Sequence, residues 1–284
     1  MSRVQEAGMM EKRKQWKGFT DFQLKWLALV LMVFDHIHYF FEFTGKVPEW
    51  FSMLGRVSAP LFLFCLLEGF AHTRNRKKYF LRIYAIAVGM GALQYVFLSF
   101  VRRPDGFVPQ NQMLATFSIL LVILQGIEWC RQRQWLKGLC AVLLPLLWPV
   151  LGMGLIYQVP ASTPVVLILH YTVLPMHTAI MDGGTYFILE GLLLYGLRKN
   201  RALQAAGFFV AALLLEGLAP FLLTPGAEFR MLFTQMYGWM SGFAAIPMYL
   251  YNGKRGRGNK KLFYWFYPAH VYVLYGISWV MQIF

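Results

Sequence analysis

The sequence predicts an all-α fold, a polytopic helical membrane bundle of nine or ten spans. Of its 284 residues, 58% are hydrophobic and only 14% are charged, whereas about 25% are charged in an ordinary soluble domain. So few polar side chains would leave the surface of a soluble protein uncovered, and so high a hydrophobic content excludes a disordered chain. Since a helical span needs about 20 apolar residues, nine or ten spans leave room only for short loops. We therefore expect a single transmembrane helical domain over 20–284, preceded by a basic cytoplasmic tail over 1–19.

Ten apolar runs are the candidate spans. They lie at about 20–42, 51–71, 82–101, 113–130, 138–157, 164–180, 184–197, 203–222, 233–251 and 262–283. Proline residues inside these runs predict kinks or breaks, which membrane helices tolerate when neighbouring groups satisfy the freed backbone. These prolines are Pro60, Pro145, Pro149, Pro175 and Pro220.

Basic residues outnumber acidic residues by 27 to 13, which gives a formal net charge of +14. They stand in short blocks between apolar runs, as the positive-inside rule predicts for a membrane protein, so we expect no nucleic-acid partner. The blocks are the N-terminal tail and the segments 74–82, 131–137, 198–201 and 254–261. The first three blocks alternate correctly if the N-terminus is cytoplasmic, and the first run is then expected to be an uncleaved anchor.

The last two basic blocks stay cytoplasmic only if one run between 138 and 197 does not cross. The best candidate is 164–180, because it contains His170, Pro175 and His177. We interpret it as a re-entrant or outer-surface segment, which gives nine crossings; ten crossings with the last two blocks outside is the alternative. No carboxylate stands at ligand spacing within this run, so we expect no metal site there.

The first run carries ionisable residues inside an apolar helix, and each is a functional hypothesis because burying charge in a membrane is costly. Lys25 and His36 are eleven residues apart, so they share one helix face about 16 Å apart. Asp35 points about 100° away from that face. Histidine is a suitable general base near neutral pH. The structural alternative for His36 is a hydrogen bond between helices.

The second run carries one basic and one acidic residue. If the loop 43–50 is a hairpin, Arg56 comes level with Asp35 and His36, and the simplest expectation is an Arg56–Asp35 ion pair. The functional interpretation adds that Arg56 stabilises a developing oxyanion. Glu68 is expected either to pair with Lys25 or to reach toward the cytoplasmic interface.

A dense basic block follows the second run. It consists of Arg74, Arg76, Lys77, Lys78 and Arg82. One interpretation is a topology determinant, and the other is a clamp for the phosphates of a ligand such as coenzyme A. Three acids further along, Asp182, Glu190 and Glu216, have no assigned role, and His270 is expected near the headgroups because it follows an aromatic stretch.

These residues resemble the TraX family of bacterial integral membrane proteins over nearly the whole chain. The strongest parts are Leu24-Lys25 through Asp35-His36, Gly55-Arg56 through Pro60, Leu67 through Tyr79, Leu250 through Gly256, and Phe266 through His270. The resemblance implies a bacterial inner-membrane protein, and the named member of that family acetylates the N-terminus of a conjugative pilin. The family is also similar to transmembrane acyltransferases that use acetyl-CoA and carry a basic residue, ten intervening residues and a histidine in the first span. Lys25 and His36 fit that pattern, with Lys in place of the commoner Arg, although no second acyltransferase motif is found.

The expected function is therefore that of a membrane-bound, acetyl-CoA-dependent O- or N-acetyltransferase that contacts membrane lipid and needs no metal. His36 is the expected catalytic residue, assisted by Asp35 and Arg56. The expected coenzyme A side consists of Lys25, Glu68, Arg74, Arg76, Lys77, Lys78 and Arg82. Two alternatives stay open: a transporter or flippase that relays protons through buried His, Asp and Glu residues, and a structural assembly protein of a secretion or conjugation apparatus. The acceptor, a protein N-terminus, a glycan or a small molecule, is not fixed by the residues.

Overall fold

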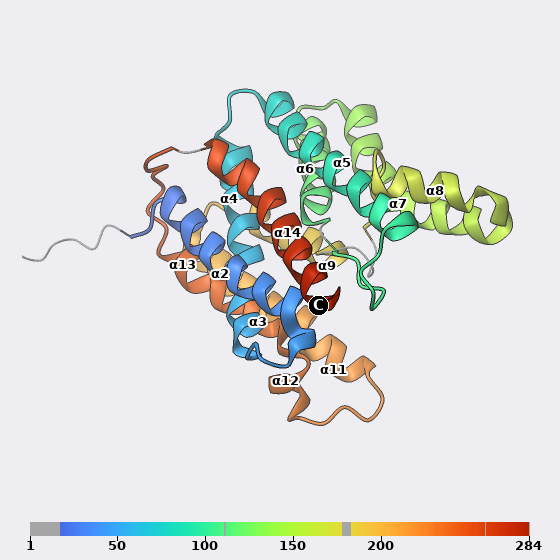
Figure 1. Cartoon of the computed structure of the whole chain (residues 1–284). Helices are drawn as coiled ribbons and strands as arrows, with labels where there is room; N and C mark the ends of the chain where they lie inside the picture. The colour runs from blue at the N-terminus through green and yellow to red at the C-terminus, as the bar shows by residue number, and fades with distance from the viewer. Residues whose placement is uncertain (1–17, 111, 178–182, 259, 284) are drawn as a thin grey trace, which may run out of the picture.

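The computed structural model describes residues 18–110, 112–177, 183–258 and 260–283. Over these ranges the chain is helical and has no strand, apart from an isolated bridge between Phe19 and Tyr251 (Figure 1). The all-α prediction is confirmed for this part of the chain. Most of the N-terminal tail and Asp182 lie outside the described residues.

Thirteen α-helices are described. They are α2 (Asp21–Phe41), α3 (Trp50–Gly55), α4 (Ser58–His72), α5 (Arg76–Phe100), α6 (Met113–Arg131), α7 (Trp135–Gln158), α8 (Thr163–Tyr171), α9 (Gly184–Gly196), α10 (Arg201–Ala212), α11 (Ala219–Leu223), α12 (Met231–Thr234), α13 (Ala245–Tyr249) and α14 (Lys260–Ile283). Between them lie the 3-10 segments η1 (Glu42–Thr44), η2 (Pro160–Ser162) and η4 (Tyr237–Ala244), and the π-helical segment η3 (Leu213–Leu218).

Six helical segments within the described ranges are long and apolar enough to cross a membrane, rather than the nine or ten expected. They are Asp21–Thr44, Trp50–His72, Arg76–Phe100, Met113–Arg131, Trp135–Gln158 and Arg201–Leu223. The remaining apolar runs do not form such helices. The run 164–180 gives the nine-residue α8, which at 1.5 Å per residue covers less than half of a ~30 Å bilayer core. The run 233–251 is divided among α12, η4 and α13, and α14 is long but less apolar because of its Tyr, Trp and His residues.

The prolines act differently from one run to another. Pro145 and Pro149 lie inside α7, which continues through both, whereas Pro60 stands in the first turn of α4, just after the break from α3. Pro175 lies in the non-helical segment after α8. Pro220 follows the π-helical segment η3, as expected where a proline ring displaces the carbonyl four residues earlier.

The core of the bundle forms around α4. Leu61, Leu63 and Phe64 of α4 are completely buried, and so are Leu120 and Leu124 of α6. In contrast, α7 packs on α6 with most of its apolar side chains exposed, and together with α8 it forms one flank of the molecule (Figure 1). These exposed side chains are suited to contact lipid.

The C-terminal helix α14 packs against α2 and α5 (Figure 1). A second apolar cluster of Phe40, Met90, Val271 and Tyr275 lies where these helices meet. Beyond it the buried side chain of Arg103 donates hydrogen bonds to the Phe40 carbonyl and the Ser278 hydroxyl, both at 3.1 Å, and to Asp105. Hydrogen bonding from Arg103 lowers the pKa of Asp105, which lies in the loop between α5 and α6. The contacts fix the end of α2 against α14.

Candidate functional site

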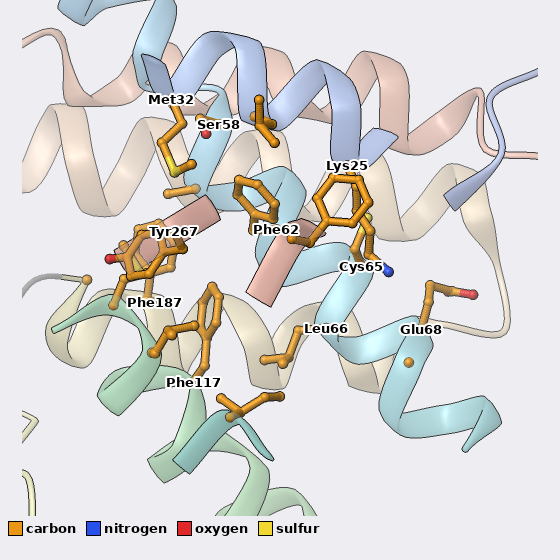
Figure 2. Close-up of a pocket in the computed structure, with 18 of the residues that line it drawn as sticks. Lys25, Met32, Ser58, Phe62, Cys65, Leu66, Glu68, Phe117, Phe187 and Tyr267 are labelled. Atoms are coloured by element: carbon orange, nitrogen blue, oxygen red, sulfur yellow. The ribbon is translucent and has the colours of Figure 1, made fainter. Parts of the chain in front are cut away.

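A cavity of about 1500 Å³ runs beside the inner face of α2. Its middle is aromatic, and Figure 2 shows side chains from α4, α6, α9 and α14 gathered there, with Lys25 and Glu68 to one side. The labelled aromatic residues are Phe62, Phe117, Phe187 and Tyr267. We call this space the bundle cavity. It has a basic end near the start of α2 and a polar end near His36.

Six basic side chains line the basic end of the bundle cavity. They are Lys25, Arg74, Lys78, Arg82, Arg255 and Arg257. The loop that carries the last two lies against the start of α2, because the Asp21 and Phe22 amides donate to the carbonyls of Lys254 and Arg255. The start of α2 is itself fixed by a capping box between Thr20 and Gln23.

The basic block after the second run divides into two groups. Arg74, Lys78 and Arg82 line the bundle cavity, while Arg76 and Lys77 do not. Arg76 instead pairs with Glu128 at 3.6 Å and lies over the Phe70 ring. Only part of the predicted phosphate clamp therefore faces the cavity.

Lys25 and Glu68 both line the cavity but do not pair with one another. Lys25 bonds to Asp21 one turn earlier, at 2.7 Å, and Glu68 pairs with Arg201 of α10, at 3.2 Å. Of the two expectations for Glu68, the pair with Lys25 was wrong, because a partner at helical i, i+4 spacing was available to Lys25. The Arg201 partner is 133 residues away from Glu68 in the sequence.

At the polar end the expected Arg56–Asp35 ion pair is confirmed. The Arg56 guanidinium donates to Asp35 at 2.6 Å, and the Ser52 hydroxyl donates to the same oxygen at 3.2 Å. Gly55 makes this approach possible, because a Cβ there would overlap the Asp35 side chain. Arg56 and Asp35 both line the cavity beside His36.

His36 faces the same cavity as Lys25, as their eleven-residue spacing predicts. Its Nδ1 lies 2.9 Å from the Met32 carbonyl oxygen, and 3.7 Å from an Asp35 oxygen. A carbonyl oxygen only accepts hydrogen bonds, so in the neutral ring Nδ1 carries the hydrogen and Nε2 the lone pair. The Met32 contact thus leaves Nε2 as the basic nitrogen of the neutral His36 ring.

Sequence reasoning left three features of this end without a role. His270, expected near the headgroups, is buried, and its ring centroid lies 4.7 Å from that of His36. Glu216 lines the cavity from η3, and Glu190 lies fully buried within electrostatic range of it. The sequence signal for these residues was the presence of ionisable side chains in apolar runs.

The two histidines near α8 lie outside this group. His170 Nδ1 accepts a hydrogen bond from the Met176 amide at 3.0 Å, and His177 Nδ1 lies 3.2 Å from the Thr185 hydroxyl. Each therefore has a separate local partner rather than the other histidine.

Comparison with known proteins identifies the family. The family model described as TraX protein matches residues 21–278, which include all of α2 and most of α14. The chain is 26% identical over 280 residues to the probable fimbrial assembly protein FimC, serogroup H1, of Dichelobacter nodosus, and the match covers 93% of this chain and 98% of that protein. No solved structure matches the chain. The protein therefore belongs to the TraX family of membrane proteins.

Proposed function

We propose that this protein is a membrane-bound acyltransferase that moves an acetyl group from acetyl-CoA to an amine or hydroxyl acceptor. The observation that carries the proposal is one continuous cavity that joins a basic end to His36, whose Nδ1 faces the Met32 carbonyl and whose Nε2 has no hydrogen-bond partner among the described residues. Lys25 and His36 mark the two ends and lie about 16 Å apart along α2. A phosphate-bearing ligand anchored at the first end reaches His36 only with an extended arm, which coenzyme A has.

The basic end suits the phosphates of coenzyme A. Within the described part of the chain, Arg74, Lys78, Arg82, Arg255 and Arg257 form no ion pair with an acidic side chain. Unpaired guanidinium and ammonium groups at a cavity entrance bind phosphate oxygens strongly. Under the positive-inside rule these basic loops lie in the cytoplasm, where acetyl-CoA is made. We therefore place the N-terminus on the cytoplasmic side of the inner membrane.

The polar end suits attack on a thioester. The acceptor oxygen or nitrogen forms a bond to the acetyl carbonyl carbon while His36 Nε2 takes its proton. Arg56, held by Asp35, stabilises the negative charge on the carbonyl oxygen. The C–S bond then breaks, and the thiolate of coenzyme A takes the proton from His36 and leaves as a thiol.

The acceptor is proposed to be a subunit of a surface fibre. Support comes from the relative described as a probable fimbrial assembly protein and from the pilin acetylation that the TraX resemblance implies. The polar end, which lies toward the outer side in this orientation, is where such an acceptor would enter.

The test uses purified protein in lipid nanodiscs with acetyl-CoA labelled in the acetyl group. The probe acceptors are 2-phenylethylamine and 2-phenylethanol, whose rings suit the aromatic middle of the cavity. We expect saturable release of the coenzyme A thiol and transfer of label to at least one probe. If the protein neither binds acetyl-CoA nor releases its thiol, the proposal is wrong.

A second candidate function is a transporter or flippase with a proton relay. The observation that favours it is Glu190, which is fully buried and has neither carboxyl oxygen hydrogen-bonded to a described residue. Glu190 lies within electrostatic range of Glu216, which lines the cavity. This candidate predicts proton flux across proteoliposomes without consumption of acetyl-CoA. A pH-sensitive dye enclosed in the vesicles measures that flux directly.

A further inference from the structure

His270 of α14 is in direct ring contact with His36 of α2. Their centroids are 4.7 Å apart with the planes inclined at 60°. His270 is 8% exposed and, unlike His36, does not line the bundle cavity. His270 therefore acts on a reaction in the cavity through its ring neighbours, which are His36 and the cavity-lining Phe266 and Tyr267.

The two rings are held in the same way. His270 Nδ1 lies 2.8 Å from the Phe266 carbonyl oxygen, just as His36 Nδ1 faces the Met32 carbonyl. The Phe266 ring also stacks on His270, at 5.0 Å and 10°. Since the carbonyl oxygen accepts, Nδ1 carries a hydrogen and the lone pair of the neutral His270 ring is on Nε2.

The Nε2 atom of His270 is buried and has no hydrogen-bond partner among the described residues. A hydrogen there would bury a positive charge, and His270 forms no ion pair with a described acid, so the neutral ring is the stable form. A buried acceptor without a partner destabilises a fold, and such atoms in native proteins call for an explanation. A positive charge on the neighbouring ring would interact favourably with this lone pair and with the electron-rich ring.

We propose that His270 is a positioning residue for acyl transfer: it fixes the His36 ring and stabilises the imidazolium that forms when His36 takes the acceptor's proton. This inference rests on the proposed acyltransferase function. Asp35 also lies near His36. Its Oδ1 accepts from Arg56 and Ser52, which offsets its charge, and its Oδ2 lies 3.7 Å from His36 Nδ1. His270 is a second, uncharged neighbour, whose ring contacts that of His36.

The test compares three variants by steady-state thiol release from acetyl-CoA with the two probe acceptors. His270→Phe keeps a ring on Phe266 but removes both nitrogens, and His270→Gln supplies a carbonyl oxygen in place of Nε2. Tyr275→Phe is the matched control, because it removes another buried polar group of α14, one that donates to the Phe107 carbonyl. We expect His270→Phe to lower kcat by about tenfold or more with little change in the KM for acetyl-CoA. His270→Gln should recover most of that loss, and Tyr275→Phe should behave as wild type.

The outcomes separate the two proposals. Wild-type kcat in His270→Phe, or equal losses in the Phe and Gln variants, would overturn the positioning role and leave the acyltransferase function standing. No thiol release from the wild type would overturn both. Nitrogen-15 spectra of histidine-labelled protein add a readout independent of turnover: His270→Phe should shift the His36 side-chain signals, and unchanged signals would contradict the ring contact.

Discussion

The Arg56 guanidinium lies 2.6 Å from the Asp35 carboxylate, and this pair joins the end of α3 to α2 one residue before His36. Arg56→Gln would leave the Asp35 charge without its strongest partner. We expect a loss of about 1.5 kcal/mol in the free energy of unfolding, the lower end of the range for charged hydrogen bonds, because the Arg56 side chain stays 39% exposed. Thermal unfolding in detergent measures it.

The double variant Asp35→Asn with Arg56→Gln is the control for that change. Because it removes both charges, it should recover part of the lost stability. If the double variant loses as much stability as Asp35→Asn and Arg56→Gln lose together when measured singly, the two side chains do not interact.

Close packing of α5 against α8 is expected to depend on one glycine. A Cβ at Gly91 would overlap the Tyr171 carbonyl oxygen of α8, whereas a Cβ at Gly89 meets nothing within 4 Å. Gly91→Ala should therefore lower the melting temperature. Gly89→Ala, on the same helix, should be neutral or add up to about 1 kcal/mol through helix propensity. Equal melting temperatures for the two variants would contradict the packing of α5 on α8.

The basic end of the bundle cavity is expected to set the affinity for acetyl-CoA. Lys78→Gln or Arg82→Gln should raise its KM about tenfold, on the order of one charged hydrogen bond, with a smaller change in kcat. Lys77→Gln is a matched control from the same block, because Lys77 does not line the cavity. A similar rise in KM for Lys77→Gln would mean that net charge, rather than the cavity lining, attracts the ligand.

Local spacing was enough to predict several of these relationships. The helical period placed Lys25 and His36 on one face, and the short connection between the first two runs placed Arg56 beside Asp35. Both depend on residues near one another in the sequence. The Glu68–Arg201 pair and the His36–His270 contact could not be found in this way, because they depend on how distant helices pack.

The number of spans was overestimated for a related reason. Apolar composition marks a segment as buried or lipid-facing without fixing its length as a helix. In 233–251, Gly238, Gly242 and Pro247 accompany a 3-10 segment and a five-residue helix. At 164–180, which the nine-span interpretation already treated as not crossing, the helix ends at Tyr171, before Pro175.

The measurement that tests the central claim most directly is the rate of thiol release from acetyl-CoA by wild-type, His36→Ala and His38→Ala protein. His38 is a matched control, because it is a buried histidine of the same helix that does not line the cavity. We expect His36→Ala to remain folded and membrane-inserted but to lose roughly 10²- to 10⁴-fold in rate, and His38→Ala to keep most of its activity. Full activity in His36→Ala would contradict the assignment of His36 as the base.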